Sequence, residues 1–191
     1  MTVKAMVIED HGGPDRFKRV EQELGQPGPG EVLIRHKAVG LNFIDVYQRT
    51  GLYPMTLPHV LGMEAAGVIE AVGPGVDRFA TGDHVISVFV PSCGYCEPCR
   101  SGRPALCEPG AAANGAGEMI GGGTRLSRNG EPVYHMTGVA CYAEKAVMSQ
   151  NSLVKIDKDL PLDIAALMGC AVLTGAGAVF NSGDVCPGCS T

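Results

Sequence analysis

Four cysteines with a regular spacing are the residues of this sequence best suited to chemistry. They follow the pattern C-x2-C-x2-C-x7-C and are Cys93, Cys96, Cys99 and Cys107. Two intervening residues allow successive thiolates to point at one centre about 2.3 Å away, and four soft sulfurs in a tetrahedron suit Zn²⁺. Because the protein would fill all four positions, none would remain for water or substrate. The spacing therefore predicts a structural zinc site with one ion per chain.

Two other uses of these cysteines stay open. C-x2-C-x2-C also begins the bacterial ferredoxin pattern, but that pattern continues with three residues and then Cys-Pro. Here seven residues intervene and Glu108 follows the fourth cysteine, which favours zinc over an iron–sulfur cluster. Chance spacing or disulfide formation is the remaining alternative. Residues 1–5 do not resemble a secretion signal, so we expect a reducing, cytoplasmic compartment in which the eight cysteines are thiols or metal ligands.

The remaining reactive residue types show no pattern that indicates a second site. Cys186 and Cys189 form a C-x2-C pair in a turn-like tail without a helix N-terminus to lower a thiol pKa. We interpret that pair as incidental, with a disulfide or an adventitious metal site as the alternative. Cys141 is expected to pack as a small apolar residue. The five histidines lie far apart in the sequence and are expected to be surface or core residues rather than ligands.

No glycine-rich phosphate loop is evident in the sequence. The candidates are the Gly-Ala-Gly segments at 115–117 and 175–177. Each lacks the third glycine of G-x-G-x-x-G, because Ile120 and Phe180 stand at that position. Neither follows a strand of a βαβ unit. We therefore expect no cofactor-binding residue in this chain.

The composition predicts a turn-rich globular protein. Among 191 residues, 45% are apolar, 27 are Gly and 13 are Pro, and the net charge is −5. Such a charge balance, without a basic cluster, argues against nucleic acid and against an anionic membrane surface as partners. Residues 164–180 are nearly all apolar, but three glycines interrupt them and the stretch is short for a membrane span. We expect one or two buried helices there.

The elements that would position these residues are mostly short strands. Apolar and β-branched patterning predicts strands at residues 3–8, 31–39, 65–72, 84–90, 142–148 and 152–156. Asn129-Gly130 predicts a tight hairpin within 125–135. A short helix is expected at 42–49, a small-residue loop from the cysteine segment to Gly123, and a helix opening at Pro161. This order favours a β-rich barrel or sandwich over a βαβ nucleotide domain.

Two stretches of the sequence resemble enzymes of one superfamily. Residues 80–182 resemble the zinc-containing alcohol dehydrogenases of the medium-chain dehydrogenase/reductase family, through Gly82-Asp83-His84-Val85, the cysteine segment, and residues 142–144, 151–156 and 166–170. Residues 1–79 resemble the zinc-free quinone oxidoreductases, through residues 40–47 (GLNFIDVY) and 49–54 (RTGLYP). The chain is therefore interpreted as a hybrid of two branches that meet near residue 80.

The resemblance implies a fold and a domain organisation. Both branches share a mainly β (α+β), chaperonin-10 (GroES)-like, partly open β-barrel. We assign residues 1–160 to this catalytic domain, with a zinc lobe at 91–109. Residues 161–191 are then a helical linker that leads toward a Rossmann nucleotide-binding domain absent from this chain. Apolar surface that the rest of such an enzyme covers should be exposed, and a homodimer is one possible consequence.

The resemblance also locates a catalytic centre that departs from the family. Alcohol dehydrogenases of this family bind a catalytic zinc with Cys, His and Cys, and the matching positions here are Asn42, Met63 and Cys170. An amide and a thioether are poor Zn²⁺ ligands, so we expect no catalytic zinc. Ile44 replaces the hydroxyl residue that relays the alcohol proton. Asp45 and Glu64, the acidic residues that surround the ligands in the family, are both present, and so is Tyr47.

These observations leave three functions open. The first is an NAD(P)-dependent oxidoreductase domain, truncated and inactive or weak alone, whose substrate by resemblance is a small alcohol, aldehyde or quinone. Its NAD or NADP would bind only with the missing domain. The second is a non-catalytic, zinc-stabilised interaction module. The third is a quinone reductase half that obtains NADPH from a second chain. In the quinone reading no metal is needed, and Asn42, Tyr47 and Tyr53 would line the substrate pocket.

Overall fold

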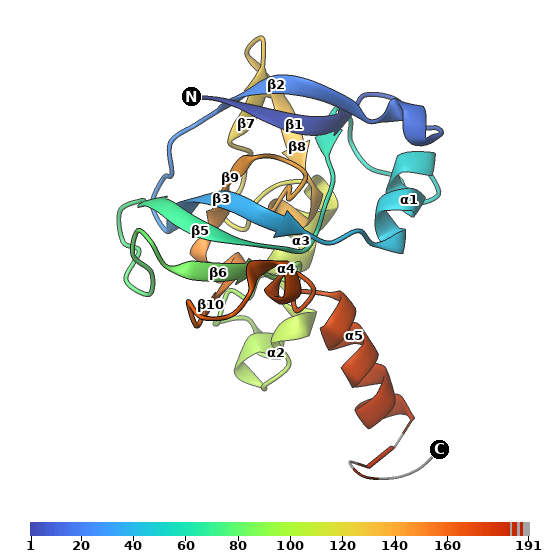
Figure 1. Cartoon of the computed structure of the whole chain (residues 1–191), viewed down its shortest axis with the longest axis vertical. Coiled ribbons are helices and arrows are strands. Elements are labelled where there is room, and N and C mark those ends of the chain that lie inside the picture. Colours follow the sequence, from blue (N-terminus) through green and yellow to red (C-terminus); the bar gives the residue numbers. More distant parts are fainter. Residues whose placement is uncertain (184, 187, 189–191) are drawn as a thin grey trace.

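The fold consists of two stacked β layers from which one helix projects (Figure 1). The computed structural model describes residues 1–183, 185–186 and 188. One layer is a closed barrel with the strand order β1-β2-β7-β8-β4. Its strands are β1 (Thr2–Ile8), β2 (Lys18–Leu24), β4 (His59–Val60), β7 (Leu126–Arg128) and β8 (Glu131–His135). Short β4 closes the barrel because it pairs antiparallel with β1 and parallel with β8.

The second layer is a five-stranded sheet with the order β10-β6-β5-β3-β9. Its strands are β3 (Glu31–Val39), β5 (Ala65–Val72), β6 (His84–Ser87), β9 (Lys145–Ser149) and β10 (Leu153–Ile156). All its pairings are antiparallel, and β3 lies between β5 and β9. The register of β3 on β5 shifts between His36 and Ala38. A Cβ at Gly67 would lie 2.4 Å from the Arg35 carbonyl oxygen, so this crossing requires glycine.

The apolar core is built from alternate residues of these strands. In β1, Val3, Ala5 and Val7 are buried, whereas Thr2 and Lys4 face outward. They pack with residues of β3, β4, β7, β8 and β9 in one cluster. A second cluster on β3, β5, β9 and β10 includes Phe79. Full burial of one such aliphatic side chain stabilises the fold by roughly 1.5–3 kcal/mol, so both layers contribute to holding the barrel together.

The helices are short and lie outside the two layers. They are α1 (Phe43–Thr50), α2 (Glu97–Arg100), α3 (Glu108–Ala116), α4 (Leu162–Ala165) and α5 (Ala171–Gly177), and α5 continues into a π turn at Ala178–Ser182. Short 3-10 turns occupy Pro14–Arg16, Pro104–Leu106, Met136–Gly138 and Gln150–Ser152. Helix α1 begins after Asn42 and ends at Gly51, whose φ of 82° suits a residue without a Cβ.

Most of the predicted strands are confirmed, and so is the GroES-like fold. Strands at 31–39 and 65–72 match β3 and β5 at both ends. The hairpin turn is confirmed, because Asn129 and Gly130 have φ values of 55° and 82° between paired Arg128 and Glu131. Strands β2 and β4 were not predicted from the sequence. Alternation is weak in the charged β2, and β4 has two residues, too few for any periodicity to register.

Two predictions about helices are wrong. A loop was expected from the end of the cysteine segment to Gly123, but Glu108–Ala116 form α3, whose first turn is capped by the Cys107 sulfur accepting from the Gly110 N–H. The apolar stretch 164–180 was expected to be buried, yet Leu173 is 63% exposed and Phe180 is 54% exposed. Helix α5 and its π turn extend away from the barrel, as Figure 1 shows. No helix among the described residues is long and apolar enough to cross a membrane.

Candidate metal centre and candidate active site

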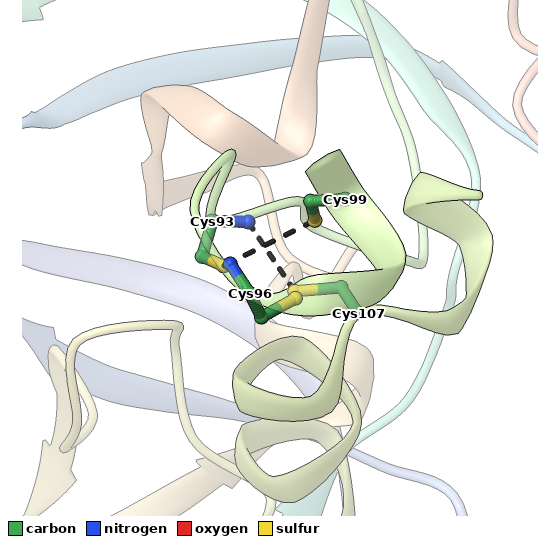
Figure 2. Close-up of side chains that lie close together, drawn as sticks. All are labelled: Cys93, Cys96, Cys99 and Cys107. Atoms are coloured by element: carbon green, nitrogen blue, oxygen red, sulfur yellow. Dashed lines mark hydrogen bonds between the residues drawn. The ribbon is translucent and has the colours of Figure 1, made fainter. Parts of the chain in front are cut away.

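The four cysteines of the C-x2-C-x2-C-x7-C pattern converge on one point. The sulfurs of Cys93, Cys96, Cys99 and Cys107 all lie within 4.8 Å of one another, and Figure 2 shows them facing a common centre. The Cys93 and Cys99 sulfurs are 4.0 Å apart. Sulfurs in a ZnS₄ tetrahedron with 2.3 Å bonds would be about 3.8 Å apart. The number, type and spacing of these donors therefore fit a Zn²⁺ ion.

Backbone amides around the cluster favour the thiolate forms that a metal requires. The Cys93 N–H donates to the Cys107 sulfur and the Cys96 N–H to the Cys93 sulfur, both over 3.3 Å (Figure 2). Desolvation opposes ionisation of Cys93, but the N–H groups of Tyr95 and Cys96 outweigh it and lower its pKa to about 7. The Gly94 N–H favours the Cys99 thiolate, yet desolvation and the other sulfurs raise its pKa to about 12. Without a cation, four thiolates cannot all ionise together, whereas a bound Zn²⁺ would stabilise them.

Helix α3 joins this cluster to the barrel. Cys107 is fully buried at the start of α3, and a Cβ at Gly110 would lie 2.3 Å from the Pro91 carbonyl oxygen. Farther along α3, the Asn114 side-chain amide donates to the Phe89 carbonyl over 2.7 Å. At its C-terminal end, the His135 N–H of β8 donates to the Gly117 carbonyl over 2.8 Å. The helix that the sequence analysis missed is therefore the rigid connection between the cysteines and the fold.

The other cysteines do not join this centre. Cys141 is buried, as expected for a small apolar residue, and burial raises its pKa to about 12. The four lobe cysteines, Cys141 and Cys170 are free thiols. Cys186 is disulfide-bonded, so the expectation that every cysteine is a thiol or a metal ligand is wrong for that residue. Cys189 lies outside the described residues, so the interpretation of the C-x2-C pair as incidental stays a prediction.

A second cluster gathers the residues that the family resemblance marked as catalytic. Asn42 precedes α1, Glu64 lies between β4 and β5, and Cys170 precedes α5. The Asn42 side-chain Nδ2 donates to Glu64 Oε1 over 3.0 Å. The backbone N–H groups of Cys170 and Ala171 donate to Glu64 Oε2 over 2.8 and 3.0 Å. Glu64 is fully buried, and three neutral N–H donors satisfy both of its oxygens.

Asp45 is the second buried carboxylate of this cluster, and its donors are also neutral. Its Oδ2 accepts from the Asn42 N–H over 2.9 Å and from the Tyr142 hydroxyl over 2.7 Å. Its Oδ1 accepts from the Gly62 N–H over 3.2 Å. Burial raises the pKa of Asp45 and the nearby Glu64 adds to this effect, although the three hydrogen bonds partly offset both. Among the ion pairs of the described residues, none involves Asp45 or Glu64.

The positions matched to catalytic-zinc ligands are used differently here. Met63 is buried in an apolar cluster with Ile8, Leu61 and Met136, and Ile44 packs at its edge. The Cys170 thiol lies 3.9 Å from the Thr174 hydroxyl, and desolvation raises its pKa. Within the described residues, the only group of three or more His, Cys, Asp or Glu with metal-binding geometry is the four-cysteine cluster.

Three aromatic side chains lie together on α1 and the turn that follows it. Phe43 is 80% exposed, and its ring centroid lies 6.4 Å from that of Tyr47. Tyr47 and Tyr53 have ring centroids 5.3 Å apart. The structure therefore brings both predicted tyrosines onto one surface of α1 and the turn that follows it. Phe43 belongs to the same surface, and the sequence analysis did not single it out.

Tyr142 is a further site residue that sequence reasoning missed. It was assigned to a strand, but the strand begins at Lys145 and Tyr142 instead reaches Asp45. Burial and the Asp45 carboxylate raise the pKa of its hydroxyl. Tyr142 also lines a cleft of about 500 Å³ beside β1 and the end of β3. Spacing alone offered no signal for this contact, because 97 residues separate Tyr142 from Asp45.

Two buried histidines lie apart from both centres. His59 of β4 and His135 of β8 are almost completely buried. Burial lowers the pKa of His59 to about 4 and that of His135 to about 3. The expectation that the histidines are surface or core residues is confirmed for this pair. Both remain neutral at physiological pH, which matters for acid stability.

Comparison with known proteins identifies the family. The sequence model of the alcohol dehydrogenase GroES-like domain matches residues 28–158. The chain belongs to this family, within the medium-chain dehydrogenase/reductases. The matched range includes both sides of residue 80, where the two resemblances were expected to meet.

Individual relatives share both sequence and structure with the chain. A putative alcohol dehydrogenase D of Mycobacterium tuberculosis is 42% identical over 185 residues, which is 97% of this chain and 50% of that protein. An alcohol dehydrogenase zinc-binding domain protein from Burkholderia ambifaria superposes with a TM-score of 0.89 at 39% identity, covering 100% of this chain and 51% of that one. A quinone oxidoreductase of Pseudomonas syringae has a TM-score of 0.66 at 31% identity, covering 97% and 43%. The chain spans about half the length of the curated relatives it matches.

Proposed function

We propose that this chain is the barrel-containing catalytic portion of an NAD(P)-dependent oxidoreductase that holds zinc in its cysteine lobe alone. Its substrate in this proposal is an electron-poor carbonyl compound of the quinone type. One observation carries the proposal: the Asn42 amide and the buried Glu64 carboxylate satisfy each other by hydrogen bonding where family relatives would bind a second zinc. The buried, apolar environment of Met63 supports the same conclusion.

The residues of the site suggest how such a reaction would be assisted. NAD(P)H, when bound by a nucleotide domain, supplies the hydride. The exposed aromatic surface of Phe43, Tyr47 and Tyr53 would hold a flat ring against α1. An amide N–H of Asn42 would donate to the carbonyl oxygen, which gains negative charge as the hydride arrives. Positioning of the ring and this hydrogen bond would then supply part of the stabilisation that a catalytic metal ion gives to the carbonyl oxygen in metal-dependent enzymes.

We further propose that these 191 residues alone do not turn over substrate. The described strands form antiparallel sheets apart from the short β4–β8 pair, and they contain no βαβ unit to hold a pyrophosphate. Calorimetric titration of the pure chain with NADPH and with NADH tests this directly. We expect no saturable binding up to millimolar nucleotide. Saturable binding at micromolar concentration would contradict the proposal.

The metal content gives an independent test. Elemental analysis of carefully purified chain should return one zinc per chain and no iron or sulfide. A second tightly bound zinc, retained in a Cys107→Ser variant, would show that the centre around Asn42 binds metal after all. A Cys141→Ala variant provides the control, because it removes a buried cysteine outside the lobe.

A second candidate function is a zinc-stabilised interaction module. The exposed apolar side chains of α4, α5 and the π turn favour it, since isolated apolar patches often mark protein contacts. The same residues would also meet a nucleotide domain in the first proposal. Joining the chain to the nucleotide domain of a relative distinguishes the two, because the oxidoreductase proposal expects quinone reduction by the joined protein and the module does not.

A further inference from the structure

We propose that Glu64 is a positioning residue that fixes the Asn42 side-chain amide as a hydrogen-bond donor at the substrate site. This inference deepens the proposed function and rests on it for the identity of the substrate. It adds a role for a buried carboxylate that touches neither the substrate nor, in this proposal, a metal ion.

The orientation of the Asn42 amide follows from the chemistry of its partner. A carboxylate is an acceptor at both oxygens, so the amide edge that faces Glu64 Oε1 must be the NH₂ group and not the carbonyl. The 3.0 Å contact uses one of its two N–H bonds. Among the hydrogen bonds of the described residues, the Asn42 Nδ2 atom donates to no other partner. A second N–H therefore remains for a ligand, and the Asn42 side chain is only partly buried.

Glu64 itself has little freedom to rotate. Its second oxygen is held by the Cys170 and Ala171 N–H groups at the start of α5. Two glycines close around the side chain: a Cβ at Gly40 would lie 2.4 Å from Oε1, and a Cβ at Gly169 would lie 3.3 Å from the Glu64 Cβ. Because both oxygens and both sides are fixed, the orientation imposed on Asn42 is fixed too.

The arrangement has a consequence for the kind of substrate atom that fits. With its NH₂ group held toward Glu64, residue 42 offers a donor, and a carbonyl oxygen is the acceptor that matches it. If the amide were reversed, its oxygen would face the Glu64 carboxylate. The hydrogen bond would be lost and a repulsive contact between two oxygens would take its place. Glu64 thus selects the donor form without contacting the substrate.

A reciprocal exchange of donor and acceptor tests this role. Asn42→Asp removes the donor and places two carboxylates together. Glu64→Gln supplies one donor and one acceptor. With its oxygen on the α5 amides, its NH₂ group faces residue 42 and favours the reversed Asn42 amide; with its oxygen on the Asn42 NH₂, the α5 amides lose their acceptor. The double variant Asn42→Asp/Glu64→Gln restores every contact with the donor and acceptor reversed. The single and double variants differ little in size from the parent, so the comparison concerns hydrogen bonding rather than packing.

The primary measurement is hydrogen exchange by NMR, on the backbone amides of Cys170 and Ala171 and, where residue 42 is Asn, on its side-chain NH₂ protons. Each single variant should accelerate exchange of the α5 amides or of the Asn42 NH₂ at least tenfold, and the double variant should return the α5 amides to within threefold of the parent. The Asn114 NH₂ group, bonded to the Phe89 carbonyl, is the internal control. A Glu118→Gln variant, which alters a carboxylate bonded to Gly123, is the matched control.

The outcomes separate this inference from the proposed function. Unchanged exchange at Asn42, Cys170 and Ala171 in Glu64→Gln would overturn the positioning role. Binding of 1,4-naphthoquinone, followed through the ring signals of labelled tyrosines, reports on the substrate class. The parent should bind the quinone, and the double variant, although its α5 anchor is restored, should bind at least tenfold more weakly. If the parent shows the expected exchange pattern but no quinone binding, the proposed substrate fails while the role of Glu64 in orienting Asn42 stands.

Discussion

The cysteine lobe and the Asn42–Glu64 cluster are two polar centres that the same fold stabilises in opposite ways. In the lobe, four sulfurs within 15 residues converge on a space that fits a cation, and their thiolates repel one another without it. In the other cluster, two buried carboxylates from distant parts of the chain are satisfied by neutral N–H and O–H donors. The first centre gathers the donors that a cation would bind, whereas the carboxylates of the second centre are hydrogen-bonded by groups of the protein itself.

In the proposed function, the second centre is a family site that lacks its metal and keeps its acidic residues. Two ligand positions have become an amide and a thioether, yet both acidic neighbours remain buried because backbone amides, Asn42 and Tyr142 donate to them. A buried charge without partners would be strongly destabilising. Each hydrogen bond to such a carboxylate contributes roughly 1.5–3 kcal/mol, so three of them can replace the electrostatic support of a cation. Four experiments would challenge or refine this contrast.

The largest effect is expected from removal of a lobe ligand. Cys107→Ser should abolish zinc binding and destabilise the chain by several kcal/mol, because the three remaining thiolates cannot complete the tetrahedron. Zinc content and the free energy of unfolding in urea measure the two effects. Cys141→Ala, which alters a buried cysteine outside the lobe, should keep one zinc per chain. Full zinc content in Cys107→Ser would show that the lobe does not depend on the fourth sulfur.

A packing change in α3 should weaken the lobe without touching a ligand. In Gly110→Ala the new Cβ would lie 2.3 Å from the Pro91 carbonyl oxygen, so α3 must shift. We expect a loss of about 2 kcal/mol in unfolding free energy, together with weaker zinc retention against a chelator. Gly115→Ala in the same helix has no atom within 4 Å of the new Cβ and is the matched control. It should stabilise the chain slightly, by up to about 1 kcal/mol. Equal stability of the two variants would contradict the packing argument.

The buried histidines should make the stability of the barrel depend on pH, independently of the cysteine lobe and of the Asn42–Glu64 cluster. The folded-state pKa of His59, about 4, lies below the value of about 6.5 for an unfolded chain, so the unfolded state binds more protons below pH 6.5. The corresponding stability is fully present above pH 6.5 and is lost as the pH falls toward 4. His59→Phe should remove about 2 kcal/mol of the loss between pH 7 and pH 5.

Urea unfolding of parent and variant at both pH values measures this difference, and His11→Gln, which alters an exposed histidine, is the control. Parallel pH profiles for the parent and His59→Phe would rule out a contribution from His59. Because zinc release in acid affects parent and variant alike, the difference between them isolates the histidine.

The smallest effect concerns the neutral donors themselves. Tyr142→Phe deletes the hydroxyl that donates to Asp45 over 2.7 Å but leaves the Asn42 and Gly62 N–H groups in place. We expect a loss of about 1–2 kcal/mol in unfolding free energy and no change in zinc content. Tyr134→Phe offers a tyrosine outside the cluster for comparison. A loss of zinc in Tyr142→Phe would mean that the two centres are coupled and not independent of each other.

The sequence alone determined the centre whose residues are close together. Spacing of two residues confines neighbouring thiolates to one small volume whatever the rest of the fold does, so the cysteine cluster was predictable residue by residue. Strands β3 and β5 were predictable for a related reason, since apolar and β-branched patterning is a local property. Helix α3 was not, because it begins at a sulfur cap and packs closely on the Pro91 carbonyl, and no apolar periodicity marks either contact.

Only the tertiary structure decided how the second centre works. Family resemblance placed Asn42, Asp45, Glu64 and Cys170 at catalytic positions, but it could not say that the Asn42 amide turns toward Glu64 or that Tyr142 reaches Asp45 across 97 residues. Hydrogen bonds of this kind depend on where separate strands and helices bring their ends together. Spacing in the chain specified the sulfur tetrahedron, whereas the meeting of α1, the β4–β5 loop and the start of α5 specified a carboxylate site that is stable without a cation.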